Sequence, residues 1–351
     1  MKRNILLLTV LLFLMACGRQ HKQVVKPLRF YTDVCLRTTP VKNQGTSSLC
    51  WAYAMLATIE TEHIMKGDSI NLSIDYVARS FLKEQALEAC LLRHKQDASL
   101  TTRGMMPMTI RLIQTYGVTH YDAYHRRDNV NFYVLTRQLR LAINGASSVA
   151  DCNRQTDQLL DKALGSFSNH VFLFGAQYTP LEFAHSVCRD DEYEAMTSFS
   201  HHPFGKRFPL EVADNLYHDN YLNVPIDTLM KTIVEHVKRG HPVCWEGDIS
   251  ENGFSFEQGV AVLDNEQTNI TQELRQQAFE NHETTDDHCM EIVGLAHDQN
   301  GRRYFIMKNS WGTGNPFGGF MYVSYNYVKL KTIAIVASAD ITQTIDKQNK
   351  K

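Results

Sequence analysis

The sequence has little net charge, because its 36 Lys and Arg residues nearly balance its 38 Asp and Glu residues. With a formal charge of −2 and a pI of about 6.7, the chain lacks the broad basic footprint of a nucleic-acid-binding protein, so no nucleic-acid partner is expected. It also lacks internal repeats and low-complexity blocks, and 43% of its residues are hydrophobic, which excludes a disordered or collagen-like chain. Its 351 residues allow two lobes or one enlarged domain.

Long apolar runs are scarce, and the one at the start of the chain is too short to cross a membrane comfortably. It follows a short positive segment and ends at Leu14-Met15-Ala16-Cys17, which resembles a bacterial lipobox. We therefore expect a lipoprotein signal peptide over residues 1–16, lipidation of Cys17 and a polar tether over residues 17–35. The protein is then exported and anchored by lipid in the bacterial cell envelope. An ordinary signal peptide with a chance cysteine and an uncleaved anchoring helix are the alternatives.

The eight cysteines include no closely spaced CxxC pair, so the sequence predicts neither a metal cluster nor a disulfide scaffold. Setting Cys17 aside leaves an odd number of cysteines, which directs attention to one functional thiol. Whether the remaining cysteines form disulfides stays open. No metal site is expected at the histidines either. Adjacent side chains such as His201 and His202 are expected to point in different directions on a solvated loop.

Hydrophobic periodicity changes along the chain from a helical pattern to an alternating one. The helical segments expected are 50–66, 74–92, 104–117, 151–164 and 226–239. The expected strands are 242–245, 290–296, 304–308 and 320–324, separated by turn sequences rich in Gly and Asn. Helices followed by strands predict an α+β fold with two lobes and a cleft between them.

The loop from Pro40 to Leu49 runs directly into an apolar helix that begins at Cys50. Unpaired N–H groups at a helix N-terminus favour an anion, so the pKa of the Cys50 thiol should be lowered and the reactive thiolate should form. Gln44 lies six residues upstream, where its side-chain NH₂ can turn toward a carbonyl attacked by Cys50. The Gln44 side-chain NH₂ and the Cys50 backbone N–H would together form an oxyanion hole. Taken alone, this loop-to-helix pattern also fits a buried structural cysteine.

Two later segments supply partners for a thiolate. His288 opens an alternating strand, and Asn309 lies in the run Lys308-Asn309-Ser310-Trp311-Gly312. A thiolate needs an imidazole, and the imidazole needs an acceptor on its other nitrogen that orients it. Asn309 can offer its carbonyl, and Trp311 can shield that bond from water. The preceding pair Asp286-Asp287 is interpreted as a charged loop that favours protonated His288, rather than as a metal ligand.

Together these segments resemble the papain superfamily of cysteine peptidases. The resemblance implies a papain-like, two-lobed peptidase domain over residues 36–351. Its helical lobe would span about 45–200, and its antiparallel, β-barrel-like lobe would span about 240–340. It also implies the following roles: Cys50 as nucleophile, His288 as general acid and base, Asn309 as orienting residue, Gln44 as oxyanion donor, and Trp51 and Trp311 as supporting residues.

Two departures from papain resemble the bleomycin hydrolase and aminopeptidase C branch. His288 follows Cys50 by 238 residues, against roughly 130–150 in papain, and the short segment before Gln44 leaves no room for an inhibitory propeptide. The branch implies helical insertions, no cofactor and aminopeptidase activity on peptides. In members of this branch, the C-terminal carboxylate of the chain meets the α-amino group of the substrate, and the members form hexamers. Further stretches resemble the branch: 71–76, 104–118, 178–183, 221–226 and 258–260.

Three features keep alternatives open. Lys350 and Lys351 stand beside the terminal carboxylate and would repel a substrate ammonium group, which favours a papain-like endopeptidase. The shorter chain and the lipid tether also weaken the expectation of a hexamer. A non-catalytic peptide-binding module of the same fold would be expected to lack at least one of Cys50, His288, Asn309 and Gln44.

Overall fold

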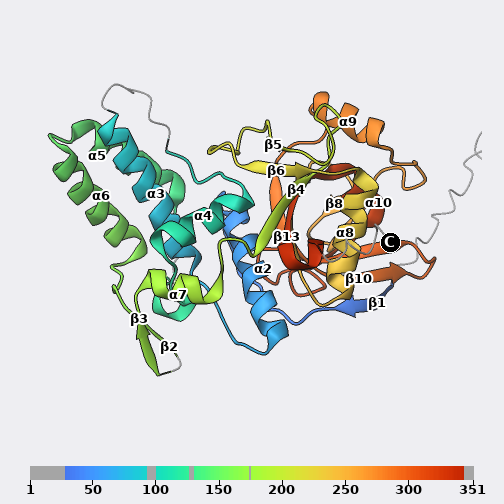
Figure 1. Cartoon of the computed structure of the whole chain (residues 1–351), viewed down its shortest axis with the longest axis horizontal. Coiled ribbons are helices and arrows are strands. Elements are labelled where there is room, and N and C mark those ends of the chain that lie inside the picture. Colours follow the sequence, from blue (N-terminus) through green and yellow to red (C-terminus); the bar gives the residue numbers. More distant parts are fainter. Residues whose placement is uncertain (1–27, 93–99, 126–129, 174, 344–351) are drawn as a thin grey trace, which may run out of the picture.

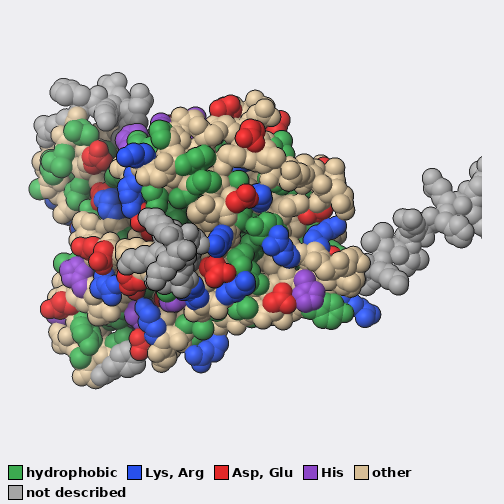
Figure 2. Space-filling model, turned by 45° about the vertical axis from the view of Figure 1, so that its right-hand side comes forward, with side chains coloured by type: hydrophobic (Ala, Val, Ile, Leu, Met, Phe, Trp, Pro, Cys, Tyr) green, Lys and Arg blue, Asp and Glu red, His purple; other side chains and the backbone are tan. Residues whose placement is uncertain are grey.

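The computed structural model describes residues 28–92, 100–125, 130–173 and 175–343 of the chain. A group of helices lies on one side of the molecule and a large twisted sheet on the other, with helix α2 between them (Figure 1). This arrangement confirms the α+β fold expected from the sequence. Acidic and basic side chains are intermixed over the face shown in Figure 2.

The helical side is built around α2 (Cys50–Lys66), in which almost every residue from Trp51 to Glu62 is buried. A helix that is apolar on all sides must be covered on all sides, which explains its central place. The helices expected at 74–92, 104–117 and 151–164 are confirmed within two residues at each end, whereas two others were not expected. The observed elements are α3 (Ile74–Leu91), α4 (Met106–Tyr116), η1 (Tyr121–Ala123), α5 (Phe132–Gly145), α6 (Val149–Leu164), β2 (Val171–Leu173), β3 (Ala176–Tyr178) and α7 (Pro180–Val187).

In the described residues the sheet has 11 strands in the order β5-β6-β4-β13-β7-β10-β11-β12-β9-β8, with β1 paired to β10. All pairs are antiparallel except β4 with β6 and β9 with β12. The sheet has two ends, β5 and β8, and does not close into a barrel within this part of the chain. Its strands are β1 (Phe30–Cys35), β4 (Tyr193–Thr197), β5 (Arg207–Pro209), β6 (Asn220–Asn223), β7 (Val243–Gly247), β8 (Phe254–Ser255), β9 (Val260–Ala261), β10 (His288–Asp298), β11 (Arg303–Lys308), β12 (Phe320–Ser324) and β13 (Thr332–Ser338).

Two sequence expectations need correction here. Residues 30–35 were assigned to the tether, but they form β1, which pairs along β10 from Phe30↔Asp298 to Cys35↔Gly294. The sheet also takes strands β4, β5 and β6 from before residue 240. These segments were missed because strands of three to five residues carry too few alternating positions to stand out from their surroundings.

The two faces of the sheet bury different neighbours. Side chains alternate along β7, so Val243 and Trp245 pack with α8 (Ile226–Lys238) on one face. Cys244 belongs to the core shared with α2 on the other face. The shorter helices α9 (Gln272–Glu280) and α10 (Tyr325–Lys331) complete the sheet side. The face that carries Cys244 is therefore the one that looks toward α2.

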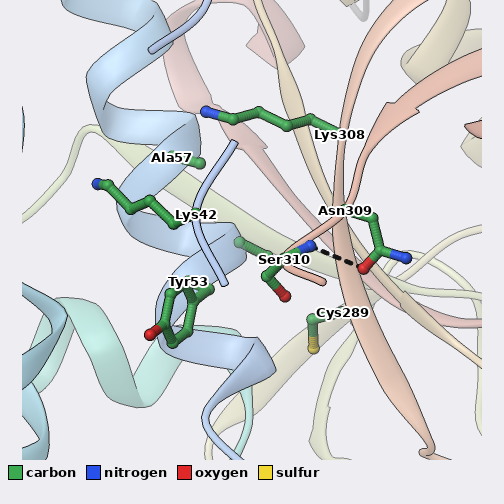
Figure 3. A pocket seen from close by; sticks show the side chains of 8 residues that line it. Lys42, Tyr53, Ala57, Cys289, Lys308, Asn309 and Ser310 are labelled. Atoms are coloured by element: carbon green, nitrogen blue, oxygen red, sulfur yellow. Dashed lines mark hydrogen bonds between the residues drawn. The ribbon is translucent and has the colours of Figure 1, made fainter. Parts of the chain in front are cut away.

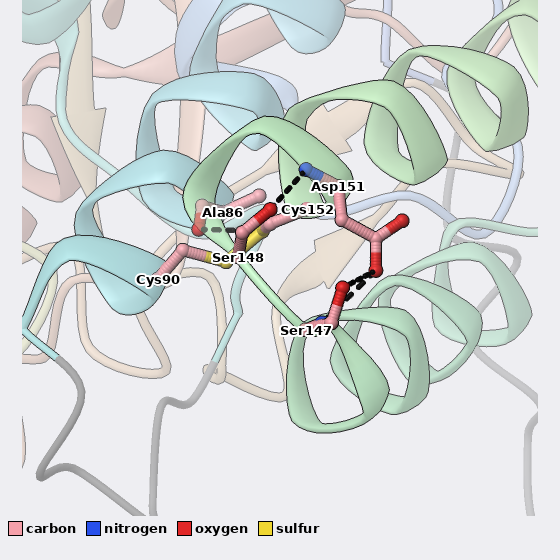
Figure 4. The surroundings of a disulfide bond; sticks show 6 residues. All are labelled: Ala86, Cys90, Ser147, Ser148, Asp151 and Cys152. Carbon is pink, nitrogen blue, oxygen red and sulfur yellow. Dashed lines mark hydrogen bonds between the residues drawn. A yellow bond between two sulfur atoms is a disulfide. The ribbon is translucent and has the colours of Figure 1, made fainter.

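One disulfide, Cys90–Cys152, joins α3 to α6 (Figure 4). The sequence predicted no disulfide scaffold, and this single bridge is not one, but the pair itself was not foreseen. The two cysteines are 62 residues apart, and only the packing of α3 against α6 brings them together. Cys35, Cys50, Cys188, Cys244 and Cys289 are free thiols.

Within the described parts of the chain, no helix combines the length and the apolar character that a membrane crossing requires. The signal peptide expected at 1–16, Cys17 and most of the tether lie outside the described residues.

Candidate active site

Cys50 is the first residue of α2 and is partly exposed. The preceding residue, Leu49, makes no side-chain cap to the helix. The N–H groups of Ala52 and Tyr53 donate to Leu49 O, so within the described residues those of Cys50 and Trp51 are left to bind an anion near the thiol. The loop before it turns at Gly45, whose φ of +58° favours glycine.

The pKa of the Cys50 thiol lies well below its ordinary value. The largest cause is a hydrogen bond from the Cys289 side chain; burial opposes it, and a hydrogen bond and charge interaction with His288 add to it. Burial raises the pKa of Cys289 well above its ordinary value, so this thiol keeps its proton and can donate it toward the Cys50 sulfur. The arrangement stabilises a thiolate at Cys50, which is the nucleophilic form.

Replacing Cys289 by alanine is expected to raise the pKa of Cys50, because the variant loses the donor that contributes most to lowering it. The thiolate would then form only at higher pH, and the rate of inactivation by iodoacetamide would begin to rise at a higher pH than in the parent protein. Measuring inactivation rate against pH tests this. Cys188→Ala, which removes a buried free thiol elsewhere, should leave the profile in place. An unchanged profile for Cys289→Ala would contradict the assignment.

His288 opens β10 and is oriented by Asn309, which follows the end of β11. The His288 Nε2 lies 2.8 Å from the Asn309 Oδ1, and both side chains are buried. Asn309 Oδ1 also accepts the Ser310 N–H at 2.7 Å, which fixes the amide (Figure 3). Because Nε2 faces the carbonyl oxygen of Asn309, the other ring nitrogen, Nδ1, is left for Cys50.

Trp311 covers the imidazole. The ring centroids of His288 and Trp311 are 4.7 Å apart with an interplanar angle of 36°. Phe254 and Phe256 pack edge-on against the indole and hold it in place. The position agrees with the shielding role expected from the sequence.

Gln44 lies beside Cys50 in the same cleft. The Ser310 hydroxyl donates to Gln44 Oε1 at 2.6 Å, so the amide nitrogen faces the other way, where it donates to Ser47 O at 2.8 Å. A side-chain amide carries two N–H donors, and this bond uses one of them. The backbone N–H of Gln44 donates to Ser310 O, which ties the loop to the segment that carries Asn309.

Trp51 is fully buried, with its indole N–H donating to Thr102 O at 2.9 Å. Its ring packs edge-on against Phe81. The side chain therefore fastens the start of α2 to the wall that includes Gly104, where an added Cβ would lie 3.2 Å from the indole. Trp51 supports Cys50 through packing, while Trp311 contacts the histidine.

A buried polar network behind these residues was missed in the sequence. Glu60 on α2 accepts from Lys42 at 2.6 Å and from the Leu72 N–H at 2.6 Å, and it also accepts from Thr39 at 2.5 Å. Lys308, directly before Asn309, donates to Thr39 at 2.8 Å. Figure 3 shows Lys42 and Lys308 extending toward α2. The network joins α2, the Gln44 loop and β11; a charged residue inside the apolar run of α2 was its signal.

A cleft lies above Cys50. Its lining joins the three sequence segments that carry Gln44, Cys50, His288 and Trp311. It also includes side chains that the sequence did not single out: Arg103, Asp214, Glu246 and Ile249.

His201 and His202 do not diverge as expected. Their Nε2 atoms both meet the carboxylate of Glu211, at 3.2 and 2.6 Å. Two residues from a loop can aim at one group because the loop backbone bends between them, whereas a strand would alternate them. These three side chains could offer converging metal ligands. However, Gln276 Nε2 donates to His201 Nδ1 at 3.0 Å, so the imidazole carries its proton on Nε2. That nitrogen faces Glu211, and a metal ion there would need it deprotonated.

Comparisons with known proteins agree with this geometry. Residues 170–349 match the Peptidase C1-like family. The chain is 23% identical over 361 residues to aminopeptidase G of Lactobacillus delbrueckii subsp. lactis, covering 84% of this chain and 79% of the relative. It is 23% identical over 373 residues to mitochondrial cysteine proteinase 1 of Saccharomyces cerevisiae (strain JAY291), covering 88% and 76%. The crystal structure of PepW from Lactobacillus rhamnosis HN001 superposes with a TM-score of 0.69 at 17% identity, covering 91% of this chain and 85% of that one, and shares its fold.

Proposed function

Because this chain belongs to the Peptidase C1-like family, it is a cysteine peptidase, and we propose that it acts as an aminopeptidase through Cys50, His288, Asn309 and Gln44. The observation that carries these roles is the bond of 2.8 Å between His288 Nε2 and Asn309 Oδ1 beside a thiol of lowered pKa. The relatives named aminopeptidase G and aminopeptidase E favour removal of single N-terminal residues over internal cleavage.

The reaction proceeds in two acyl-transfer steps. The Cys50 thiolate attacks the scissile carbonyl, and the oxyanion accepts hydrogen bonds from the Cys50 N–H and Gln44 Nε2. The tetrahedral intermediate collapses as the imidazolium of His288 gives its proton to the leaving amine, which leaves a thioester on Cys50. His288 then takes a proton from water, the hydroxide attacks the thioester, and the acid product leaves with the thiolate restored.

A matched pair of fluorogenic amides tests the aminopeptidase proposal. One carries a free α-amino group, the other is N-acetylated, and both are assayed with the parent protein and Cys50→Ala. We expect Cys50-dependent cleavage of the free form at least about tenfold faster than of the blocked form. Equal or faster cleavage of the blocked form would indicate an endopeptidase. No Cys50-dependent cleavage of either would favour a peptide-binding module that keeps the fold alone.

We also propose that the protein is exported and lipidated at Cys17, from the apolar run and the sequence Leu14-Met15-Ala16-Cys17. The lipidated protein should partition into the detergent phase of a Triton X-114 extract, and Cys17→Ser should move to the aqueous phase.

A hexameric assembly, which the family resemblance implies, predicts a mass well above 40.2 kDa in light scattering.

A further inference from the structure

The cleft beside Cys50 is rich in carboxylates that come from three separate parts of the chain. Asp214 lies in the loop between β5 and β6, Glu246 lies on β7, and Asp286 lies in the loop before β10. Arg103 is the lining residue with a permanent positive charge, and its Nε lies 2.7 Å from Asp214 Oδ1 and 3.0 Å from Oδ2. The charge of Arg103 is thus largely matched by Asp214, and the remaining carboxylates give the cleft an excess of acid.

Glu246 is the least satisfied of these groups. The residue is 2% exposed, and its Oε2 has no hydrogen-bond partner among the described residues. A buried carboxylate without a partner carries the full cost of its desolvation, which a core position would avoid by using an apolar residue. Burial, and then the charges of Asp286, Cys50 and Asp214, raise its pKa well above the ordinary value. A cation bound beside it would favour the ionised form.

The strand register places Glu246 next to the nucleophile. Glu246 pairs with Cys289 across the antiparallel β7 and β10 strands, and directly opposed residues point to the same face. Cys289 is the residue that contributes most to lowering the pKa of Cys50. Glu246 also shares the α2-facing side of β7 with Cys244, two residues earlier. Its carboxylate therefore lines the same cleft as the Cys50 sulfur.

We propose that Glu246, supported by Asp214 and Asp286, forms a subsite that binds a cationic group of the peptide substrate close to the scissile bond. The group is an ammonium or guanidinium, supplied either by the free α-amine or by a Lys or Arg side chain. Binding it supplies Glu246 Oε2 with a charge-assisted hydrogen bond that the described residues do not supply. This inference rests on the proposed peptidase function. The subsite would make the cleft prefer cationic substrates, a preference that the catalytic residues alone do not define.

Substrates that differ in one charge test the subsite. Norleucine and lysine amides of one fluorophore, each with a free or acetylated α-amine, are assayed with the parent protein, Glu246→Gln and Glu235→Gln. Glutamine keeps the shape of Glu246 and removes its charge. Glu235 is a partly exposed acid on α8, outside the cleft lining, and its variant serves as the matched control. We expect Glu246→Gln to lower kcat/KM about 10- to 100-fold for the preferred cationic substrate and less than about twofold for acetyl-norleucine amide.

The pattern of losses identifies the source of the cation. A loss for both free-amine substrates but not for acetyl-lysine amide assigns the subsite to the α-ammonium, and a loss for both lysine substrates but not for free norleucine amide assigns it to the side chain. Equal losses for charged and neutral substrates, or no loss at all, would overturn the proposal. A retained rate of Cys50 alkylation by iodoacetamide in Glu246→Gln shows that the fold and the nucleophile are intact.

A binding readout separates this proposal from the proposed function. Lysine amide, which carries both cationic groups, should protect Cys50 of the parent protein from iodoacetamide better than acetyl-norleucine amide, and Glu246→Gln should abolish that difference. Protection without any hydrolysis would sustain the subsite and refute the peptidase. Hydrolysis without charge-dependent protection would do the reverse.

Discussion

Replacing Cys50 by alanine is expected to abolish peptide hydrolysis, with a loss of at least about 10⁴-fold in kcat, because the proposed acyl-enzyme forms on the Cys50 sulfur. Residual catalysis would come only from substrate binding and the oxyanion donors. The measurement is turnover of the free-amine fluorogenic substrate by matched preparations.

Two comparisons make the Cys50→Ala result specific. Cys35→Ala removes an exposed free thiol on β1, outside the cleft lining, and should retain full activity. The circular dichroism spectrum and melting temperature of Cys50→Ala should match the parent within a few degrees, since the residue is only partly buried. Activity within tenfold of the parent would place the nucleophile elsewhere.

Replacing Gln44 by alanine is expected to lower kcat by roughly 10²–10³-fold with little change in KM. The lost N–H binds the oxyanion of the transition state more strongly than it binds the carbonyl of the bound substrate. Steady-state kinetics on the free-amine substrate measures both constants. Gln277→Ala, an exposed glutamine on α9, is the matched control and should be neutral.

The outcome for Gln44 also distinguishes two roles of its side chain. Its Oε1 accepts from Ser310, so removing the amide could loosen the loop as well as remove a donor. Ser310→Ala keeps the Gln44 donor and removes only this anchor. If Gln44→Ala costs less than tenfold, or costs no more than Ser310→Ala, the oxyanion assignment fails.

The nucleophile region was the easiest part to predict from sequence. A polar loop followed by an apolar run gives a strong signal for the start of a helix, and α2 does begin at Cys50. His288 at the start of a strand and Asn309 just after one were predicted equally well. In each case, a motif of a few residues carries both the local structure and the chemistry.

The residues that were missed depend on contacts between segments far apart in the chain. Glu60 and Lys308 belong to one network only because α2 packs beside β10, which pairs with β11. Glu246 lies in an apolar strand, and its place in the cleft follows from its pairing with Cys289, which local periodicity cannot reveal. Cys90 and Cys152 meet for the same reason.

The sheet order has a consequence for how the protein matures. β13 lies between β4 and β7, so the strand that comes last in chain order among those described occupies an interior place in the sheet. Until residues 332–338 insert, β7 lacks a neighbour, and β4, β5 and β6 have no attachment to the rest of the sheet. Such distant pairing is slow to form and leaves exposed strand edges meanwhile. A chain without residues 332–338 would therefore carry Cys50 without a complete sheet behind the cleft, which delays peptidase activity until those residues have been synthesised and inserted.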